Sequence, residues 1–293
     1  MKRTLLFESA CRLSVKNRQL VVLNVESGEE NKIPIEDIGM VVLENQMSSI
    51  TVPVFVSLIE NNASVVLCDS KHMPCSILWA LDSNTTQAEA YRSQTEMHDS
   101  LRNRLWKQIV EAKIRNQSLL LSEFGKDGAR LKPFYMNVKN GDSSNREGAA
   151  ANIYWDELFG TSFTRGRHDD IVNTLLNYGY SVLRAAMARA IMCSGLFPAF
   201  GIFHKNRYNA IPLADDLMEP YRPYVDQVVV RLLQEGVTTL DRTAKCAHVC
   251  IMQNDTKIAD TIKPLALALS VTTASFRRCA ERKDKDLVLP AFR

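Results

Sequence analysis

The sequence predicts an α+β fold, with a small β-rich N-terminal domain (residues 1–82) followed by a larger all-α domain (residues 83–293). Three observations predict this division. Short alternating or β-branched segments fill the first part, and the apolar period then changes from about 2 to about 3.6 residues. The segment Asp169–Leu196 is apolar on nearly every side, which is typical of a helix buried at the centre of a domain.

The first domain is expected to consist of short strands separated by polar turns such as Lys16-Asn17-Arg18. The expected strands are Thr4–Phe7, Cys11–Val15, Leu20–Val25, Asn31–Pro34, Gly39–Leu43 and Ala63–Cys68. Val52–Asn61 departs from this pattern and predicts one helix. Because short strands leave sheet edges that need covering, such a domain favours pairing with a second copy.

The second domain begins after the polar stretch Asp82–Gln87, where helical spacing takes over. The expected helices are Glu89–Leu121, Asp169–Leu196, Tyr224–Gln234, and a helix or pair of helices over Ile258–Lys283 that is broken near Pro264. Gly195 and Pro198 are expected to end the buried helix, and Gly236 to follow the end of the third.

Composition excludes several classes of protein. With 46% hydrophobic residues, 12 Gly and 10 Pro among 293 residues, the chain is neither disordered nor fibrous. No apolar run reaches the roughly 20 residues of a membrane span. An odd number of cysteines, seven, with no visible export signal predicts reduced thiols and a cytoplasmic protein.

The net charge of +3 conceals an uneven distribution. Up to Asp82 there are 7 Lys and Arg against 10 Asp and Glu, a net of −3, which leaves 29 against 23, a net of +6, for the rest. This basic excess favours a polyanionic partner for the second domain.

The segment Asn145–Ala151 places a carboxylate, Glu147, in the first turn of an expected helix. The plain interpretation is an acid that complements the helix dipole, with a capping role for Ser144 or Asn145. However, Glu147 shares a helix face with Ala150 and Ala151, whose small side chains allow a polar group to come close. A buried acid needs a partner, and a metal ion is a common one.

Two further segments carry polar groups that could act together with Glu147. His204 lies in a basic loop with Lys205 and Arg207, which suit phosphate oxygens. Asp216 and Glu219 stand one helical turn apart, where they could equally form an acidic turn before a helix that Pro223 begins. Carboxylates with one imidazole are suitable ligands for Mg²⁺ or Mn²⁺, with positions left for water and phosphate.

Other motifs are weaker. Cys246, His248 and Cys250 lack the second pair of ligands that a structural zinc site requires. No Walker-type phosphate loop is present, so nucleotide hydrolysis is not supported. Arg165 and Arg167 precede the buried helix and could border a site.

Taken in order, four motifs resemble those of one family. They are Arg146-Glu147-Gly148, the run Asn173–Tyr180, His204, and the segment Asp216–Pro223. This combination resembles the CRISPR spacer-acquisition integrases, the first-numbered Cas endonucleases, and the version Ala214–Pro220 is most similar to the type II subfamily. The likeness spans the whole chain and implies a β-rich dimerisation domain followed by a helical catalytic domain.

The resemblance implies a metal-dependent DNA endonuclease and integrase that inserts protospacer DNA into a CRISPR repeat array. Glu147, His204 and Glu219 fall on the family's catalytic, metal-binding positions, with Mg²⁺ or Mn²⁺ as the cofactor, and Asp216 falls on the neighbouring accessory acid. Many relatives have Asp where this chain has Glu219, which reaches one methylene further. Lys205, Arg207, Arg222 and Arg165 are the expected DNA phosphate contacts.

The same resemblance implies partners. They are double-stranded DNA, a second copy in a homodimer, and a small ferredoxin-like subunit that completes a heterohexamer. Type II relatives also work with the RNA-guided effector nuclease and an accessory ring protein. No membrane is expected. Two alternatives stay open: a structure-specific nuclease of branched DNA, and a non-catalytic DNA-binding scaffold whose acids are ordinary helix caps.

Overall fold

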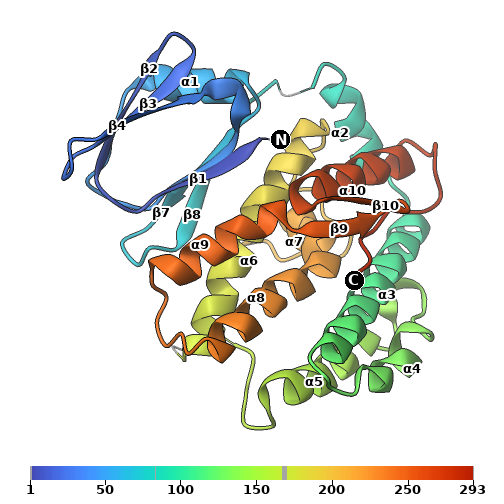
Figure 1. Cartoon of the computed structure of the whole chain (residues 1–293). Coiled ribbons are helices and arrows are strands. Elements are labelled where there is room, and N and C mark those ends of the chain that lie inside the picture. Colours follow the sequence, from blue (N-terminus) through green and yellow to red (C-terminus); the bar gives the residue numbers. More distant parts are fainter. Residues whose placement is uncertain (1, 83, 167–169, 293) are drawn as a thin grey trace. The chain divides into compact units, whose positions relative to one another are not determined.

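The computed structural model describes residues 2–82, 84–166 and 170–292. The chain divides into two compact units, Met1–Ser83 and Asn84–Arg293. Figure 1 shows that the first unit is built mainly from strands and the second mainly from helices. The mixed α+β class expected from the sequence is therefore confirmed.

Unit 1 contains two four-stranded sheets. One has the order β4-β3-β2-β6, with bounds Glu30–Pro34, Gln19–Asn24, Cys11–Lys16 and Ser49–Ile50. The other has the order β1-β5-β7-β8, with bounds Arg3–Phe7, Ile38–Leu43, Ser64–Cys68 and Pro74–Leu78. Strands β2, β3 and β4 are antiparallel, whereas β1, β5 and β7 run parallel and β8 returns antiparallel to β7.

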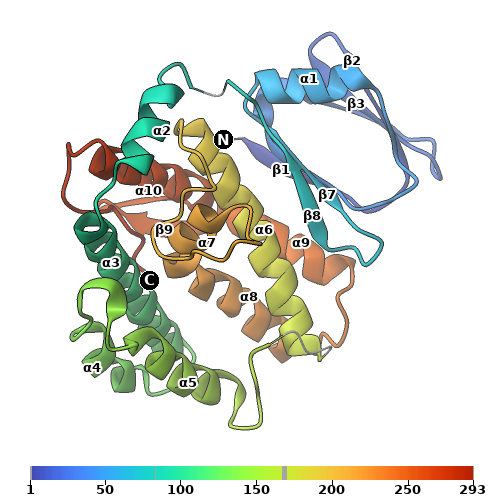
Figure 2. The same cartoon turned by 180° about the vertical axis from the view of Figure 1, so that it is seen from behind.

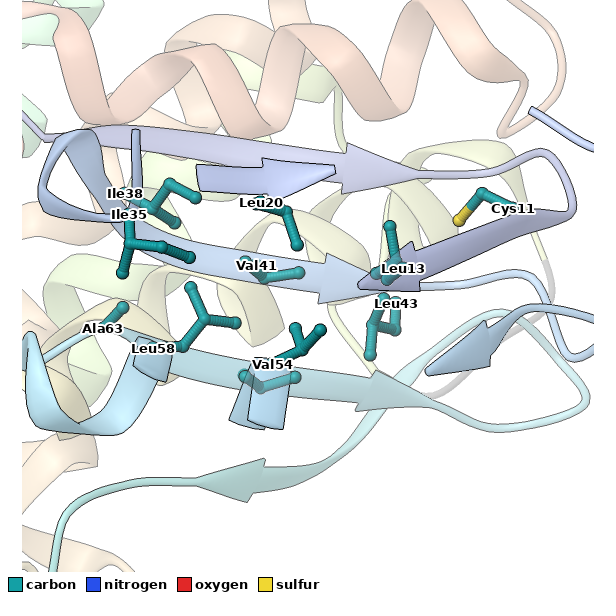
Figure 3. Packing of buried hydrophobic residues seen from close by; sticks show 11 residues of the cluster. Cys11, Leu13, Leu20, Ile35, Ile38, Val41, Leu43, Val54, Leu58 and Ala63 are labelled. Carbon is teal, nitrogen blue, oxygen red and sulfur yellow. The ribbon is translucent and has the colours of Figure 1, made fainter. Parts of the chain in front are cut away.

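The core of unit 1 is formed by apolar side chains from both sheets and from α1, Val52–Glu60 (Figure 3). Leu13 of β2, Val41 of β5 and Leu58 of α1 are each at most 2% exposed. Each such side chain contributes roughly 1.5–3 kcal/mol when it is removed from water. The alternation of Cys11 and Leu13 with exposed Arg12 and Ser14 directs one face of β2 into this core.

The expected strands and the expected helix of unit 1 are confirmed to within one or two residues at their ends. Two strands were not predicted. Strand β6 has only two residues, and β8 begins with Pro74 and has exposed or half-buried side chains in no regular alternation. Neither carries the apolar alternation by which a strand can be recognised.

Unit 2 is helical around one central helix. Its α-helices are α2 Gln87–Thr95, α3 Asp99–Glu123, α4 Lys132–Tyr135, α5 Arg146–Phe159, α6 Ile171–Cys193, α7 Pro212–Met218, α8 Arg222–Gln234, α9 Arg242–Cys250 and α10 Leu265–Ala280. Short 3₁₀ turns η1 Ile35–Asp37 in unit 1 and η2 Gly128–Leu131, η3 Asn140–Asp142, η4 Glu219–Tyr221 and η5 Ile251–Gln253 in unit 2 complete the elements. Figure 2 shows α6 at the centre of unit 2, and it contacts α7, α8, α9 and α10.

The expectation of an all-α second domain is wrong. Strands β9, Asp255–Ile258, and β10, Thr261–Pro264, form an antiparallel hairpin, and β10 lies in the first part of the segment Ile258–Lys283 where a helix or pair of helices was expected. Ala259 and Asp260 both have positive φ, 48° and 58°, which makes the two-residue turn that joins them. The alternating burial of Thr256 and Ile258 follows strand rather than helix periodicity.

Two helix boundaries also differ from expectation. The single helix expected over Glu89–Leu121 is divided into α2 and α3, because His98 caps the start of α3 by accepting a hydrogen bond from the Ser100 backbone. The buried helix is α6, capped by Asp170; its expected first residue, Asp169, lies outside the described residues. Gly195, with φ 73°, and Gly236, with φ 82°, follow the ends of α6 and α8 as expected.

Within the described ranges, no helix has both the length and the apolar character that crossing a membrane requires.

Candidate active site

Glu147 is presented by a capped helix start. Asn145 accepts a hydrogen bond from the Gly148 backbone (3.3 Å), and the buried Asp142 carboxylate accepts from the backbones of Arg146 and Glu147 (2.8 and 3.0 Å). These two side chains satisfy the free N–H groups of the first turn of α5. The Glu147 side chain is therefore not used as a cap, and its carboxylate is free to reach across to α3.

A lysine joins two of the expected site residues. The ammonium of Lys113, on α3, lies 2.5 Å from Glu147 Oε1 and 2.5 Å from Glu219 Oε2. The side chains are largely buried, with exposed fractions of 12%, 25% and 5% for Lys113, Glu147 and Glu219. Two carboxylates from different elements thus converge on a single cation inside unit 2.

Sequence reasoning missed Lys113, because it lies 34 residues before Glu147 and forms no local motif. One signal was available. Lys113 falls four residues after the buried Ile109 and three before the buried Asn116, hence near the buried face of α3. A lysine at such a position is seldom buried without a charged partner.

Glu219 is held by a second cation. Arg222 Nε donates to Glu219 Oε1 (2.8 Å), one turn along the chain where η4 passes into α8. Burial alone would raise the pKa of Glu219, but the positive charges of Arg222 and Lys113 outweigh it and lower the pKa to about 2. Glu219 is therefore a buried carboxylate that stays ionised at neutral pH.

Asp216 organises the loop that carries His204. Its carboxylate, fully buried on α7, accepts hydrogen bonds from the backbones of Ile202 (2.5 Å), Phe203 (3.0 Å) and His204 (3.2 Å). Gly201 permits this approach, because a Cβ there would lie 2.8 Å from the His204 carbonyl and 3.1 Å from Asp216 Oδ2.

The His204 ring is fixed by the same carboxylate. His204 Nδ1 lies 2.6 Å from Asp216 Oδ1, and this hydrogen bond is the main cause that raises the pKa of His204. Phe203 stacks on the buried Trp106 of α3, with ring centroids 4.4 Å apart, and the His204 ring meets Trp106 edge-on at 5.6 Å. With Nδ1 engaged by Asp216, Nε2 is the ring nitrogen left for a ligand.

The expected site residues therefore form two groups. Glu147 and Glu219 meet at Lys113, whereas Asp216 and His204 form a neighbouring pair whose imidazole is influenced by the charge of Glu219. Among the described residues, no three carboxylate, imidazole or thiolate groups lie close enough together to hold a metal ion as they stand. The donor chemistry nonetheless suits a hard divalent cation, because two buried carboxylates already share one cation.

The expected phosphate contacts are divided between two places. Arg165 and Arg222 line a cavity of about 410 Å³, which also holds Lys113 and Glu219. Lys205 and Arg207 are exposed in the loop after His204, and Arg207 stacks over the Tyr208 ring at 4.6 Å. Arg167 lies outside the described residues. The cavity is therefore lined by Lys113, which pairs with both acids, and by two arginines that a phosphate could contact.

Known proteins provide the comparison for this arrangement. Residues 4–259 match the family model of CRISPR associated protein Cas1. The CRISPR-associated endonuclease Cas1 of Neisseria meningitidis is 38% identical over 80% of this chain and 77% of its own length. One from Pyrobaculum aerophilum is 30% identical over 70% of this chain and 74% of its own length.

Solved structures have the same fold. A casposase bound to integration product superposes with a TM-score of 0.80 at 21% identity, over 98% of this chain and 92% of that one. A Cas1 protein from Thermotoga maritima gives a TM-score of 0.74 at 16% identity, over 95% of this chain and 97% of that one. The family model and the Neisseria relative together establish that this chain belongs to the CRISPR associated protein Cas1 family.

Proposed function

We propose that this chain is a divalent-metal-dependent DNA endonuclease and integrase that inserts protospacer DNA into a CRISPR repeat array. One observation carries the proposal: two largely buried carboxylates from separate elements, Glu147 and Glu219, converge on one cation beside an imidazole held by Asp216. Curated relatives named CRISPR-associated endonuclease Cas1 support the same class of chemistry.

The metal ion would be held by Glu147, His204 and Glu219, with Mg²⁺ or Mn²⁺ as the ion that suits carboxylate oxygens and one imidazole nitrogen. When bound, such an ion polarises a phosphodiester and stabilises the charge that develops on its oxygens. Asp216 keeps His204 Nε2 available by bonding to Nδ1. Lys113 already occupies the space between the two carboxylates, so it must give way or share them.

In the reaction, a 3′-hydroxyl oxygen of the protospacer forms a bond to a phosphorus atom of the repeat. The bond from that phosphorus to the repeat's own 3′ oxygen breaks. The proton lost by the attacking hydroxyl is balanced by the proton gained by the released 3′ oxygen, so no oxidant or nucleotide cofactor is needed. Arg165 and Arg222 line the cavity beside Glu219 and would bind the phosphate oxygens of the reacting strand; Lys205 and Arg207 would contact phosphates further along.

The partners follow from the proposed reaction. Double-stranded DNA is the substrate, and solved relatives include a Cas1–DNA complex and a Cas6-RT-Cas1–Cas2 complex. We propose the corresponding assembly for this chain: a homodimer formed through unit 1, two of which are bridged by a small ferredoxin-like subunit into a heterohexamer. Membership of the type II subfamily, with its effector nuclease and ring protein, belongs to the same proposal.

The test is strand transfer of a duplex with free 3′-hydroxyl ends into a plasmid that carries a repeat, in the presence of Mn²⁺ or Mg²⁺. Glu147→Gln, His204→Ala and Glu219→Gln should each lower the rate roughly 100-fold or more, because several kcal/mol of charge stabilisation is lost. Asp156→Asn is the matched control, since Asp156 is an exposed carboxylate on the same helix as Glu147. Full transfer by the three variants would refute the assignment.

The same assay separates the two alternatives. Joining of a protospacer should depend on the small partner subunit, whereas hydrolysis of branched DNA by a structure-specific nuclease would not. A DNA-binding scaffold would bind DNA but show neither joining nor cleavage with any of these ions. Hydrolysis of branched DNA without joining would replace the integrase proposal by a structure-specific nuclease, and DNA binding without either reaction would replace it by a scaffold.

A further inference from the structure

Asp226 connects three helices of unit 2 through a carboxylate that lies apart from the proposed ligands. It is 1% exposed on α8, accepts a hydrogen bond from the hydroxyl of Tyr154 on α5 (2.6 Å), and accepts another from the hydroxyl of Tyr180 on α6 (2.5 Å). Burial raises the pKa of Asp226 to about 6 although both tyrosines stabilise its charge. A buried acid is costly to keep, so its position calls for an explanation.

Of the two tyrosines, Tyr180 is the one that contacts residues of the proposed site. The guanidinium groups of Arg222 and Arg165 lie over the Tyr180 ring, 4.5 and 5.3 Å from its centroid. Among the described residues, no guanidinium lies over the Tyr154 ring, which packs against Trp155 with centroids 4.8 Å apart. Tyr180 also lines the 410 Å³ cavity that contains Glu219.

Within the part of the chain that the structure describes, each of the two arginines is held by hydrogen bonds from only one of its guanidinium nitrogens, so other guanidinium nitrogens can still donate to a ligand. Arg222 uses Nε to bind Glu219 (2.8 Å), and Arg165 uses one terminal nitrogen to bind Asn173 (2.9 Å) and the Gly166 carbonyl (2.7 Å). The terminal nitrogens of Arg222 make no hydrogen bond to any described residue. An aromatic face holds a guanidinium without using its donors, so those donors stay available for a phosphate.

We propose that Asp226 and Tyr180 are positioning residues that aim the guanidinium groups of Arg222 and Arg165 at a DNA phosphate beside Glu219. The Asp226 carboxylate fixes the Tyr180 hydroxyl, the Tyr180 ring fixes the two guanidiniums, and Arg222 in turn fixes one oxygen of Glu219. This inference rests on the proposed function, because it requires DNA to enter the cavity.

The test measures DNA affinity without chemistry, by fluorescence anisotropy of a labelled duplex in metal-free buffer across a range of salt concentrations. Arg222→Met measures the effect of losing one phosphate contact. This loss should reduce the slope of the logarithm of the DNA association constant against the logarithm of the salt concentration by about 0.9. Tyr180→Leu should weaken binding about 10-fold and reduce the slope by a similar amount, because the unsupported guanidinium no longer makes a defined contact.

Tyr154→Phe is the matched control, because it removes a hydrogen bond to the same carboxylate without touching either guanidinium. It should leave both the affinity and the slope unchanged. Tyr180→Phe retains the ring and loses only the hydroxyl, so it should weaken binding about 3-fold, and it serves if Tyr180→Leu does not fold. In the double variant Tyr180→Leu/Arg222→Met, the loss should be smaller than the sum of the two single losses, because each single variant already removes the contact made by Arg222.

Three results would overturn the inference: an unchanged salt slope in Tyr180→Leu, an equal effect of Tyr154→Phe, or additive losses in the double variant. These outcomes differ from failure of the proposed function. If the unmodified protein does not bind DNA, the proposed function fails. If it binds, and Arg222→Met weakens binding while the tyrosine variants do not, only the positioning role is wrong.

Discussion

Asp216 and Glu219 lie one helical turn apart and are equally buried, yet they are held in different ways. Asp216 accepts hydrogen bonds from three consecutive backbone N–H groups and from the His204 ring. Glu219 is held by the side-chain cations of Lys113 and Arg222. A backbone N–H group cannot leave without unfolding the loop, whereas a lysine on a flexible stem can move away.

This difference assigns separate roles to two acids that look alike in the sequence. Asp216 holds the loop and the His204 ring, so in the proposed function it would support the site without binding the metal ion. Glu219 is stabilised by partners that an incoming divalent ion could replace. Three predictions test this distinction, beginning with the largest expected effect.

Replacement of Lys113 should have the largest effect on stability. Lys113→Met leaves two largely buried carboxylates close together without their shared cation, and the free energy of unfolding should fall by about 3 kcal/mol in metal-free buffer. Mn²⁺ should restore a large part of this loss by binding in place of the ammonium. The measurement is urea denaturation with and without Mn²⁺.

Lys107→Met is the control on the same helix. Lys107 makes a partly exposed ion pair with Glu111 at 3.6 Å, so its loss should cost less than about 0.5 kcal/mol, with or without Mn²⁺. If Lys113→Met were as stable as Lys107→Met, the two acids would not depend on that cation.

Asp216→Asn should have a smaller effect that no metal ion can reverse. Loss of the charge weakens three backbone hydrogen bonds and the bond to His204, and should cost about 2 kcal/mol. The neighbouring Asp215→Asn, which loses its pair with Arg184 at 2.6 Å, should cost less than about 1 kcal/mol. Recovery of Asp216→Asn by Mn²⁺ would contradict the separation of roles.

His248 is a third buried ionisable group, and among the described residues it is held neither by backbone N–H groups nor by a side-chain cation. It is fully buried on α9, neither ring nitrogen has a hydrogen-bond partner among the described residues, and burial lowers its pKa to about 4. Gly179 makes room for it, since a Cβ there would lie 2.6 Å from His248 Nδ1. The imidazole is therefore neutral in the folded protein at neutral pH.

The imidazole of His248 binds a proton more readily in the unfolded chain than in the folded one. The contribution of the buried neutral imidazole to the free energy of unfolding is therefore complete above about pH 6.5 and is lost as the pH falls towards 4. One pH unit within that window should cost about 1.4 kcal/mol of unfolding free energy. Urea denaturation at several pH values measures this, and His248→Leu should flatten the slope by that amount. An unchanged slope in His248→Leu would show that other groups cause the pH dependence.

Local patterns predicted much of the fold, but contacts between distant segments escaped them. The expected strands of unit 1 and the buried helix α6 were found because their apolar spacing is a local property. Motifs and the resemblance to a family led to Glu147, His204, Asp216 and Glu219 as candidate site residues, and this assignment stays a prediction. Asp216, however, was expected as an accessory acid, and its role in holding the loop depends on backbone groups that no side-chain motif reveals.

Lys113 and Asp226 could not be predicted in the same way. Lys113 pairs with acids from α5 and η4, and Asp226 accepts from tyrosines on α5 and α6, so both depend on how the helices pack. The β9–β10 hairpin was missed for a different reason. Its turn requires positive φ at Ala259 and Asp260, and these residues are not the Asn-Gly type that marks such turns in a sequence.

The central claim is that Glu147 and Glu219 share a divalent ion at the place where they now share Lys113. Calorimetric titration with Mn²⁺, in the absence of DNA, tests it most directly. We expect the unmodified protein and Asp156→Asn to bind Mn²⁺ with equal affinity, Glu147→Gln and Glu219→Gln to bind it at least about 10-fold more weakly, and Lys113→Met to bind it more tightly. Equal Mn²⁺ affinity in all five proteins would contradict the claim.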